Sequence, residues 1–358
     1  MIVGAYAVLK LDAVRHNLAK VRICAPAAKI MAVIKANAYG HGLLRIAKTL
    51  TDVDAFAVAR VNEGICLREA GCTHPITVLE GFTLPNELDA ILHYQLDTVV
   101  HCVEQLVVLQ NRPEQAQLSV WLKMDTGMNR LGFKASTFPD VYSALQQCAL
   151  VKQPVGLMTH LANADDTHDD FTARQIGLFN EITRGYAAPR SIANSAGLMA
   201  WPEALADWVR PGVMLYGISP FSDRAGQSLG LQPVMSLHSH LIAVKPIEKG
   251  ETLGYGGSWR CEEDTLVGVV AIGYGDGYPR YAKSGTPVLV NGQRAPLIGR
   301  VSMDMITVDL AGQPHAKPGD PVLLWGNELP VEEIADCANT IPYTLVCGIT
   351  QRVQFIDA

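Results

Sequence analysis

Residues 30–42 read Ile-Met-Ala-Val-Ile-Lys-Ala-Asn-Ala-Tyr-Gly-His-Gly. The first five of them form a short apolar run rich in β-branched side chains, which predicts a fully buried strand. The run ends at Lys35, and a polar, glycine-rich turn follows before a helical pattern resumes at Leu43. A lysine at the carboxyl end of a buried parallel strand lies where α/β folds place their chemistry, and there it can act as an amine nucleophile or base. The alternative is a lysine that only extends from a strand end to the solvent.

The composition predicts a globular protein of the cell interior. The chain has 358 residues, of which 49% are hydrophobic and 18% charged, so we expect two domains. The net charge of -6 argues against a nucleic-acid partner. Eight scattered cysteines without a C-x-x-C pair are typical of buried thiols in a reducing compartment. Neither a basic secretory segment nor a bilayer-length apolar stretch is found, so we expect a cytoplasmic protein with no membrane partner.

Short apolar runs alternate with helical patterns over the first part of the chain. Such alternation predicts a parallel sheet with helical crossovers, and eight units are the number that closes an N-terminal (β/α)8 TIM-type barrel. A doubly wound open sheet is the competing α/β architecture. The expected strands cover residues 30–34, 55–59, 76–79, 98–100, 118–124, 155–159, 191–193 and 213–216.

The pattern changes after Pro233. Alternating and β-branched runs dominate from there on, and glycine turns such as Asn291-Gly292 give hairpin signals. We therefore expect two domains, a barrel over residues 1–233 and a mainly-β C-terminal domain over residues 234–358. The strand-like residues 1–9 precede the first barrel helix and are expected to pair with the second domain.

Polar residues follow the expected barrel strands and are predicted to share one site at the strands' carboxyl ends. Ser195 begins a helix, where its hydroxyl and the free backbone N–H groups suit a phosphate, although an ordinary serine N-cap is the alternative. Arg210, before Pro211-Gly212, could bind an anion or a ring nitrogen, or form only a surface ion pair. Together with Lys35, these features suit pyridoxal phosphate, which is held through a lysine.

A second candidate acid or base lies in the β-rich part. Tyr255 stands among glycines in Gly254-Tyr-Gly-Gly257, which would present its ring closely to a ligand, although a hairpin-turn tyrosine is the commoner case. The acidic run 165–170 could bind a metal, but carboxylates at a helix start explain it better. His238 and His240 share a strand face and lack a third ligand. No metal is therefore expected.

These segments together closely resemble bacterial alanine racemases. Residues 32–42 resemble the family's pyridoxal-phosphate attachment motif, and further matches follow in the family's order from about residue 8 to the C-terminus. Lys-Ala-Asn alone is shared with barrel-type amino-acid decarboxylases, whereas the whole set is specific to the racemases. The further matches are Lys123–Gly132, Asn194-Ser195, Val209–Gly212, Gly254–Gly256, Gly273–Tyr278, Arg300 and Met303–Met305.

The resemblance implies pyridoxal phosphate as cofactor, alanine as substrate, and a homodimer whose active sites combine both subunits. Lys35 would carry the cofactor, Arg210 would face its pyridine nitrogen, and Tyr255 would come from the other subunit and bond His160. Arg130 and Met303 would meet the substrate carboxylate, with support from Asp304 and from Lys123, which is carbamylated in many family members. Tyr39, His160, Asn194, Ser195, Gly212, Val213 and Tyr343 would bind the cofactor, and Asp165, Tyr274, Arg280 and Arg300 would line the entrance.

Inverting a stereocentre requires one base on each face of Cα. The resemblance implies that Lys35 handles the proton of D-alanine and Tyr255 that of L-alanine. One rival is a pyridoxal-phosphate decarboxylase on the same plan, which would release carbon dioxide. The other is a non-catalytic carrier of the cofactor, which would lack the domain that supplies Tyr255. Whether the racemase makes D-alanine for peptidoglycan or degrades it stays open.

Overall fold

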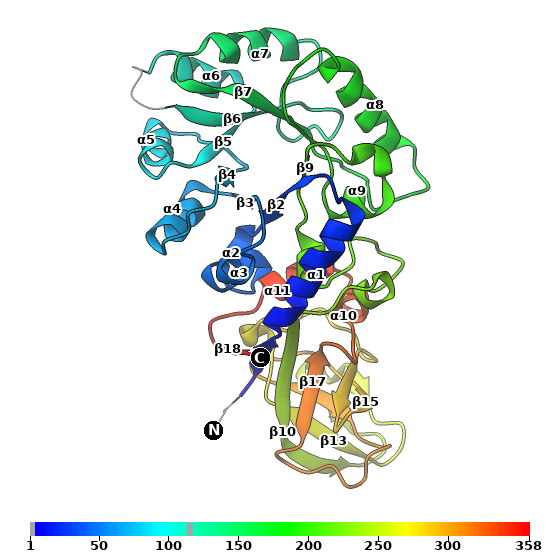
Figure 1. Cartoon of the computed structure of the whole chain (residues 1–358). Coiled ribbons are helices and arrows are strands. Elements are labelled where there is room, and N and C mark those ends of the chain that lie inside the picture. The colour runs from blue at the N-terminus through cyan, green and yellow to red at the C-terminus, as the bar shows by residue number, and fades with distance from the viewer. Residues whose placement is uncertain (1–3, 113–116) are drawn as a thin grey trace. The chain divides into compact units, whose positions relative to one another are not determined.

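The computed structural model describes residues 4–112 and 117–358 (Figure 1). The chain divides into two compact units, and some segments of the first third belong to the second unit. One unit comprises Leu18–Ala38 and Gly42–Leu215; the other comprises Met1–Asn17, Tyr39–His41 and Tyr216–Ala358. No helix in the described ranges is long and apolar enough to cross a bilayer.

The first unit is a closed barrel of parallel strands with helices around it, which confirms the expected fold class. Each strand pairs in parallel with the next, and β9 pairs back with β2 to close the ring. The strands are β2 (Lys29–Val33), β3 (Ala55–Val58), β4 (Ile76–Val78), β5 (Asp97–Val100), β6 (Leu118–Lys123), β7 (Val151–Met158), β8 (Arg190–Ser191) and β9 (Trp208–Val209).

The barrel strands are short apolar runs because both of their faces are covered. All four residues of β3 are buried, as are the last four of β2. Helices cover the outside of the barrel (Figure 1), and in barrels of this kind side chains fill the interior. The helices are α3 (Leu43–Thr49), α4 (Val61–Glu69), α5 (Pro85–His93), α6 (Val103–Gln110), α7 (Phe138–Gln147), α8 (Phe171–Thr183) and α9 (Ser195–Ala200).

The last predicted strand was wrong. Residues Val213–Tyr216 form a 3-10 helix, and the barrel closes instead with the two-residue strand β9. Pro211 and Gly212 end β9, and the N–H of Leu215 then donates to the carbonyl of Gly212. The Val-Met-Leu-Tyr run is apolar because it is fully buried, and burial alone does not distinguish a strand from a tight helical turn.

The second unit is built on an eight-stranded sheet. Strand β1 (Tyr6–Leu9) pairs antiparallel with β10 (Met235–Ile247) and parallel with β18 (Gln354–Asp357). Asn291 and Gly292, both with positive φ, turn the predicted hairpin between β14 (Pro287–Val290) and β15 (Gln293–Pro296). The sheet also contains β13 (Thr265–Val270), β16 (Ile306–Asp309) and β17 (Pro321–Trp325). The unit adds a small ribbon, β11 (Thr252–Leu253) with β12 (Trp259–Arg260), and two helices, α10 (Val331–Cys337) and α11 (Pro342–Cys347).

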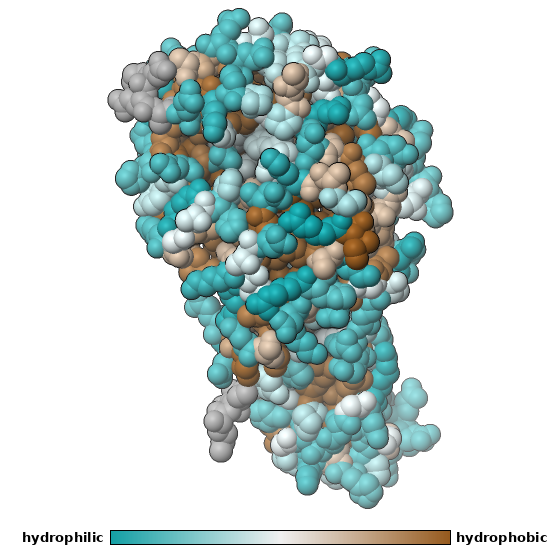
Figure 2. All heavy atoms as spheres, in the orientation of Figure 1, coloured by the Kyte–Doolittle hydropathy of each residue, from teal (hydrophilic) through white to brown (hydrophobic). Residues whose placement is uncertain are grey.

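The surface agrees with this division of buried and exposed residues. The face drawn in Figure 2 is mostly hydrophilic, with apolar side chains in smaller patches between polar ones. Each unit has a core of its own. In the barrel it includes Phe56, Phe138 and Phe179, and in the strand-rich unit Tyr278 and Trp325.

Candidate functional site

Lys35 begins an unusual left-handed turn. The turn, labelled α2 (Lys35–Tyr39), has positive φ at four successive non-glycine residues: 54° at Ala36, 53° at Asn37, 52° at Ala38 and 52° at Tyr39. Each such residue costs about 1–2 kcal/mol relative to a right-handed turn. Strain on this scale persists only where surrounding contacts impose it, and it is concentrated at functional sites.

Two side chains in the barrel unit hold the turn in place. The Glu63 carboxylate of α4 accepts hydrogen bonds from the N–H of Ala36 at 2.7 Å and from that of Ala59 at 2.8 Å. The Asn37 side chain accepts from the N–H of Leu43 at 2.8 Å and so supports the start of α3. Sequence reasoning did not identify Glu63 as part of the site. Its only local signal is a capping pattern, because its carboxylate also accepts from the N–H of Arg60.

Tyr39 ends the turn in the strand-rich unit. Its ring lies 4.8 Å from that of Tyr216 and 6.0 Å from that of Tyr343. Burial, with smaller contributions from Tyr343 and Cys347, raises the pKa of Tyr39 far above its ordinary value. The phenol therefore stays protonated and can donate to an anion. Gly40 makes this packing possible, because a Cβ there would lie 2.0 Å from the carbonyl oxygen of Val346.

Arg210 is a buried cation at the end of β9. Its side chain is 3% exposed and donates to the hydroxyl of Ser191 and to the carbonyl of Thr159 at 2.5 Å each, and to the carbonyl of Ile192 at 3.2 Å. Its Nη2 also lies 3.4 Å from Nδ1 of His160. All these partners are neutral, and no carboxylate in the described ranges forms an ion pair with Arg210. A buried guanidinium that has only neutral partners can donate hydrogen bonds to an electron-rich or anionic ligand.

His160 and Lys123 lie in the same positive field. Burial and the cations of Arg210, Lys123 and others hold the pKa of His160 well below its ordinary value, so its imidazole is neutral at pH 7. Burial, with the charges of Arg210, Arg130 and Lys35, lowers the pKa of Lys123 to about 8. The structure thus gathers Lys35, Lys123, Arg130 and Arg210 from the ends of three barrel strands into one cationic cluster. Such a cluster of cations favours the binding of an anionic ligand.

Asp125 shapes the loop that carries Arg130. Its carboxylate accepts from the N–H groups of Gly127 and Asn129 at 3.0 Å each and pairs with Lys134 at 2.5 Å. Burial raises the pKa of Asp125, but Lys134 and these N–H groups outweigh it and leave that pKa below the ordinary value. Asp125 therefore stays charged, and although it is bonded within the loop, its charge offsets part of the positive field at Lys123.

The Ser195 segment differs from a simple N-cap. Asn194 is the N-cap of α9, and its side chain accepts from the N–H of Gly197 at 2.9 Å, so the alternative of a Ser195 N-cap is wrong. The Ser195 hydroxyl instead accepts from the N–H of Gly212 at 2.9 Å. Val213 follows directly as the first residue of its 3-10 helix. Ser195 and Gly212 are thus together, as predicted for a phosphate seat.

The remaining predicted residues belong to the strand-rich unit, apart from Asp165. Tyr255 lies between β11 and β12, and its side chain is 70% exposed. The N–H groups of Tyr274 and Gly275 donate to the carbonyls of Ser302 and Met303, which joins two of the predicted segments. Asp304 pairs with Arg352 at 2.8 Å. The guanidinium of Arg280 lies 6.0 Å from the ring of Tyr274, and Arg300 lies close to Gly256.

The acidic run and the histidine pair do not form a metal site. Asp165 is exposed in the turn before α8, Asp170 is the helix's N-cap, and the helix begins directly after the acidic run, at Phe171. Asp169 accepts from the N–H of Phe171 at 3.0 Å. In the described ranges, no three metal-binding side chains come together.

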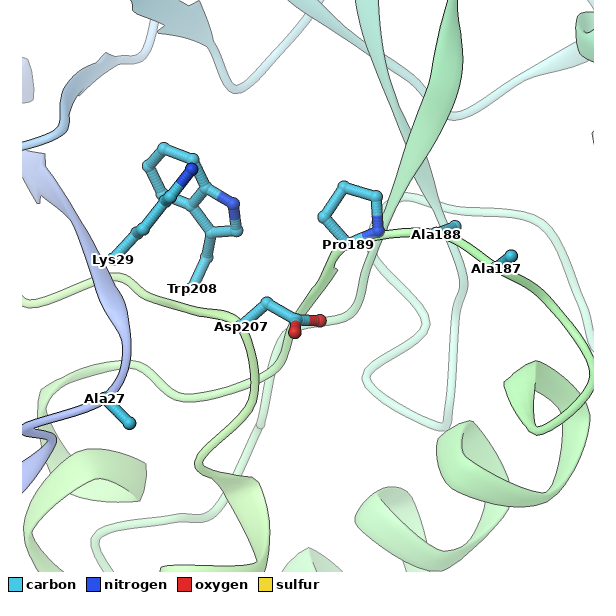
Figure 3. A pocket seen from close by; sticks show the side chains of 7 residues that line it. All are labelled: Ala27, Lys29, Ala187, Ala188, Pro189, Asp207 and Trp208. Atoms are coloured by element: carbon cyan, nitrogen blue, oxygen red, sulfur yellow. The ribbon is translucent and has the colours of Figure 1, made fainter.

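A pocket lies at the amino ends of the barrel strands, whereas the predicted site residues follow the carboxyl ends. It has a volume of about 450 Å³ and is lined by residues at the starts of β2 and β9 and before β8 (Figure 3). The ammonium of Lys29 lies over the ring of Trp208, 5.4 Å from its centre. In barrels of this kind the amino face serves stability and the carboxyl face chemistry, so we place the candidate site at the carboxyl ends.

The chain is similar to known proteins over nearly its whole length. Residues 9–220 match the family described as "Alanine racemase, N-terminal domain" and residues 234–356 match "Alanine racemase, C-terminal domain". It is 51% identical over 357 residues to a biosynthetic alanine racemase of Escherichia coli, covering 99% of each chain. It is 50% identical over 351 residues to an alanine racemase of Vibrio parahaemolyticus, covering 98% of each.

A solved structure agrees with these matches. The biosynthetic alanine racemase from Pseudomonas aeruginosa superposes with a TM-score of 0.97 at 40% identity, covering 100% of both chains. The chain matches both family domains, and it is about 50% identical to relatives over nearly their full length. Proteins that share only a fold do not show this level of identity. The chain therefore belongs to the alanine racemase family.

Proposed function

We propose that this chain is a pyridoxal-phosphate-dependent alanine racemase that interconverts L-alanine and D-alanine. Membership of the family supports the activity, and the names of the relatives from Escherichia coli and Pseudomonas aeruginosa favour a biosynthetic role, supplying D-alanine for peptidoglycan. Its scattered cysteines fit a cytoplasmic enzyme. The observation that carries the proposal is the cationic cluster of Lys35, Lys123, Arg130 and Arg210 around a neutral His160.

The donors in the barrel fit this cofactor. Arg210 cannot act as an acid at pH 7, so it can only donate to a pyridine nitrogen and leaves that nitrogen without a proton. A carboxylate in the position of Arg210 would instead favour a protonated pyridine nitrogen. In the described ranges no carboxylate pairs with Arg210. The Ser195 hydroxyl can donate to a phosphate, because its contact with the N–H of Gly212 uses only its oxygen.

We assign the remaining cofactor contacts in the same way. Tyr39, protonated because of its burial, would donate to the phosphate, with help from Tyr343 beside it. Asn194 holds the start of α9 and so orients Ser195. Gly212, whose own N–H donates to the Ser195 hydroxyl, would border the phosphate, and the N–H of Val213 would be a further donor to it. When bound, pyridoxal phosphate would supply an electron sink for the negative charge that remains on Cα of alanine after it loses its proton.

Two groups would move that proton, one on each face of Cα. Lys35 would anchor the cofactor and then serve as the base for D-alanine. Tyr255 would serve as the base for L-alanine. It belongs to the other unit, and its exposed ring is available to a second copy of the chain. In the resulting homodimer, His160 of one subunit would hold the phenol of Tyr255 of the other.

The substrate would be bound through its carboxylate. Arg130 supplies charge, and the backbone N–H of Met303 supplies a further donor from the other subunit. Asp304 is tied to Arg352 and so holds the Met303 loop. A carbamate on Lys123 would bring a negative charge next to Arg130 and orient it, and the lowered pKa of Lys123 favours the neutral amine that carbamylation requires. Asp165, Tyr274, Arg280 and Arg300 would line the entrance.

The surface of the strand-rich unit supports the dimer. Tyr255, Tyr274, Met303 and Met305 are all at least 40% exposed, although they are large and apolar. Hydrogen bonds join the segments that carry Tyr274 and Met303. Exposed apolar side chains on connected segments are typical of a protein–protein interface.

The decisive experiment is to incubate the purified protein with L-alanine and, separately, with D-alanine. Circular dichroism should fall to zero from either side, and no carbon dioxide should be released. Release of carbon dioxide would instead indicate a decarboxylase, whose product from alanine, ethylamine, is achiral and would also lose the circular dichroism.

The attachment site is tested separately. After borohydride treatment, peptide mass spectrometry should find the reduced cofactor on Lys35, and Lys35→Ala should carry none. Label on a different lysine would refute the assignment.

A further inference from the structure

Three polar side chains next to residues of the candidate site are almost completely buried. Thr126 follows β6, Thr159 follows β7, and Gln175 lies in α8; their exposed fractions are 6%, 1% and 0%. Thr159 directly precedes His160, and Thr126 is three residues beyond Lys123. Thr126 lies within the matched segment Lys123–Gly132, but the sequence predicted no role for any of the three. Buried polar groups such as these are costly unless every donor and acceptor is satisfied.

Hydrogen bonds join the three side chains into a chain with one direction. The Thr159 hydroxyl donates its only proton to the carbonyl of Met124 at 2.9 Å. In the contact of 2.8 Å between the two hydroxyls, Thr126 must therefore be the donor. Because Thr126 has spent its proton, the amide nitrogen of Gln175, 3.0 Å away, must donate to it. The order runs from Gln175 through Thr126 and Thr159 to Met124, and such aligned bonds strengthen one another.

Gln175 also holds the backbone on both sides of Leu161. Its amide nitrogen donates to the carbonyl of His160 at 3.2 Å, and its amide oxygen accepts from the N–H of Ala162 at 2.9 Å. The carbonyl of Thr159, on the other side of His160, accepts from Arg210. His160 is thus fixed through its own carbonyl and through that of the preceding residue.

We propose that Gln175 and Thr126 are positioning residues that set the placement of His160 and of the end of β6, which carries Lys123. Their polar groups bond protein atoms, so they would act through the backbone of the residues that bind substrate and cofactor. The inference rests on the proposed function, because His160 matters through its bond to Tyr255 of a second subunit. A shift of about 1 Å in such a group can cost on the order of a hundredfold in rate.

The protein contains a matched control in Gln105 of α6. Gln105 is 3% exposed, its amide oxygen accepts from the N–H of His101 at 2.8 Å, and its amide nitrogen donates to the carbonyl of Phe82 at 2.9 Å. Its amide nitrogen also lies 3.2 Å from Nε2 of His101, so it ties barrel segments in the same manner but through His101 and not through His160. Gln175→Met and Gln105→Met remove the same groups and should lower the melting temperature by similar amounts.

Activity distinguishes the two variants at a temperature well below both melting points. We expect Gln105→Met to keep kcat/KM within about threefold of the wild type, and Gln175→Met to lose on the order of tenfold to a hundredfold. Hydrogen exchange at Cα in deuterated water gives a second readout. Because His160 holds the base for L-alanine, Gln175→Met should slow exchange of L-alanine at least fivefold more than exchange of D-alanine, whereas a purely structural defect lowers both equally.

Thr126 supplies the variant that keeps the shape. Thr126→Val removes only the hydroxyl and should reproduce the unequal loss of exchange, and Thr126→Ser should restore both rates. Equal behaviour of Gln175→Met and Gln105→Met, or equal losses for the two enantiomers, overturns the positioning role while the wild type still racemises. A wild type that leaves alanine unchanged overturns the proposed function, and this role with it.

Discussion

Replacing Lys123 with methionine tests the cost of the buried cationic cluster. Lys123 is 8% exposed, and its pKa of about 8 lies below the ordinary value of 10.5. One pKa unit corresponds to about 1.4 kcal/mol, so the difference amounts to roughly 3 kcal/mol of unfavourable burial of the ammonium. Methionine keeps the length of the side chain without its charge. In bicarbonate-free buffer at pH 7, Lys123→Met should therefore be more stable than the wild type by about 3 kcal/mol.

The pH dependence follows from the direction of the shift. Below about pH 8 the folded and unfolded chains both carry the proton, so the folded wild type bears the whole burial cost. Between pH 8 and 10.5 the folded chain has released the proton while the unfolded chain still binds it, so stability rises with pH. The stability difference between Lys123→Met and the wild type should therefore shrink toward zero across that range.

Thermal unfolding followed by circular dichroism measures the difference. An advantage of about 3 kcal/mol corresponds to a rise in Tm of several degrees. Adding bicarbonate should raise the Tm of the wild type, because a carbamate replaces the buried cation by an anion beside Arg130 and Arg210, and it should leave Lys123→Met unchanged. The control is Lys48→Met, which removes an exposed lysine from α3 and should stay within about 0.5 kcal/mol of the wild type. Equal Tm values for the wild type and Lys123→Met at pH 7 without bicarbonate would refute the reasoning.

Three further substitutions probe other parts of the site. Tyr255→Phe should slow Cα exchange of L-alanine in deuterated water far more than that of D-alanine; equal losses would contradict the assignment of two bases. Gly40→Ala should destabilise by at least about 2 kcal/mol in thermal unfolding, because its Cβ would meet the carbonyl of Val346 at 2.0 Å. Gly71→Ala is its control, because Gly71 has a φ of 83° but a Cβ there would meet no atom. It should be destabilised only by the cost of a positive φ at an alanine, and therefore by less than Gly40→Ala. Asn194→Ala should lose about 1 kcal/mol through its cap and also retain less cofactor on gel filtration, and full retention would speak against its role in the phosphate seat.

The alternation of strands and helices could be predicted from the sequence because it depends on local patterns. Buried parallel strands are short apolar runs, and Lys35 stands out at the end of one of them because a charge interrupts the run. The Asn291-Gly292 hairpin was predicted for the same reason, since its turn requires residues that tolerate positive φ. The proposed site residues could be taken from the family motifs, because each motif lies within a few consecutive positions.

Other features were decided by contacts between residues far apart in the chain. Lys-Ala-Asn-Ala-Tyr has the composition of an ordinary helix, yet Glu63 and the surrounding packing hold it in a left-handed turn. Val213–Tyr216 has the composition of a strand, yet it turns into a 3-10 helix after Gly212. The bonds of Gln175 to Thr126 and His160 cross 49 and 15 positions of the chain. A local pattern reports which face of an element is buried. Only the tertiary structure determines which donor meets which acceptor. A hydrogen bond forms or fails with differences of a few tenths of an ångström in the distance between donor and acceptor, and here the two atoms belong to segments far apart in the chain.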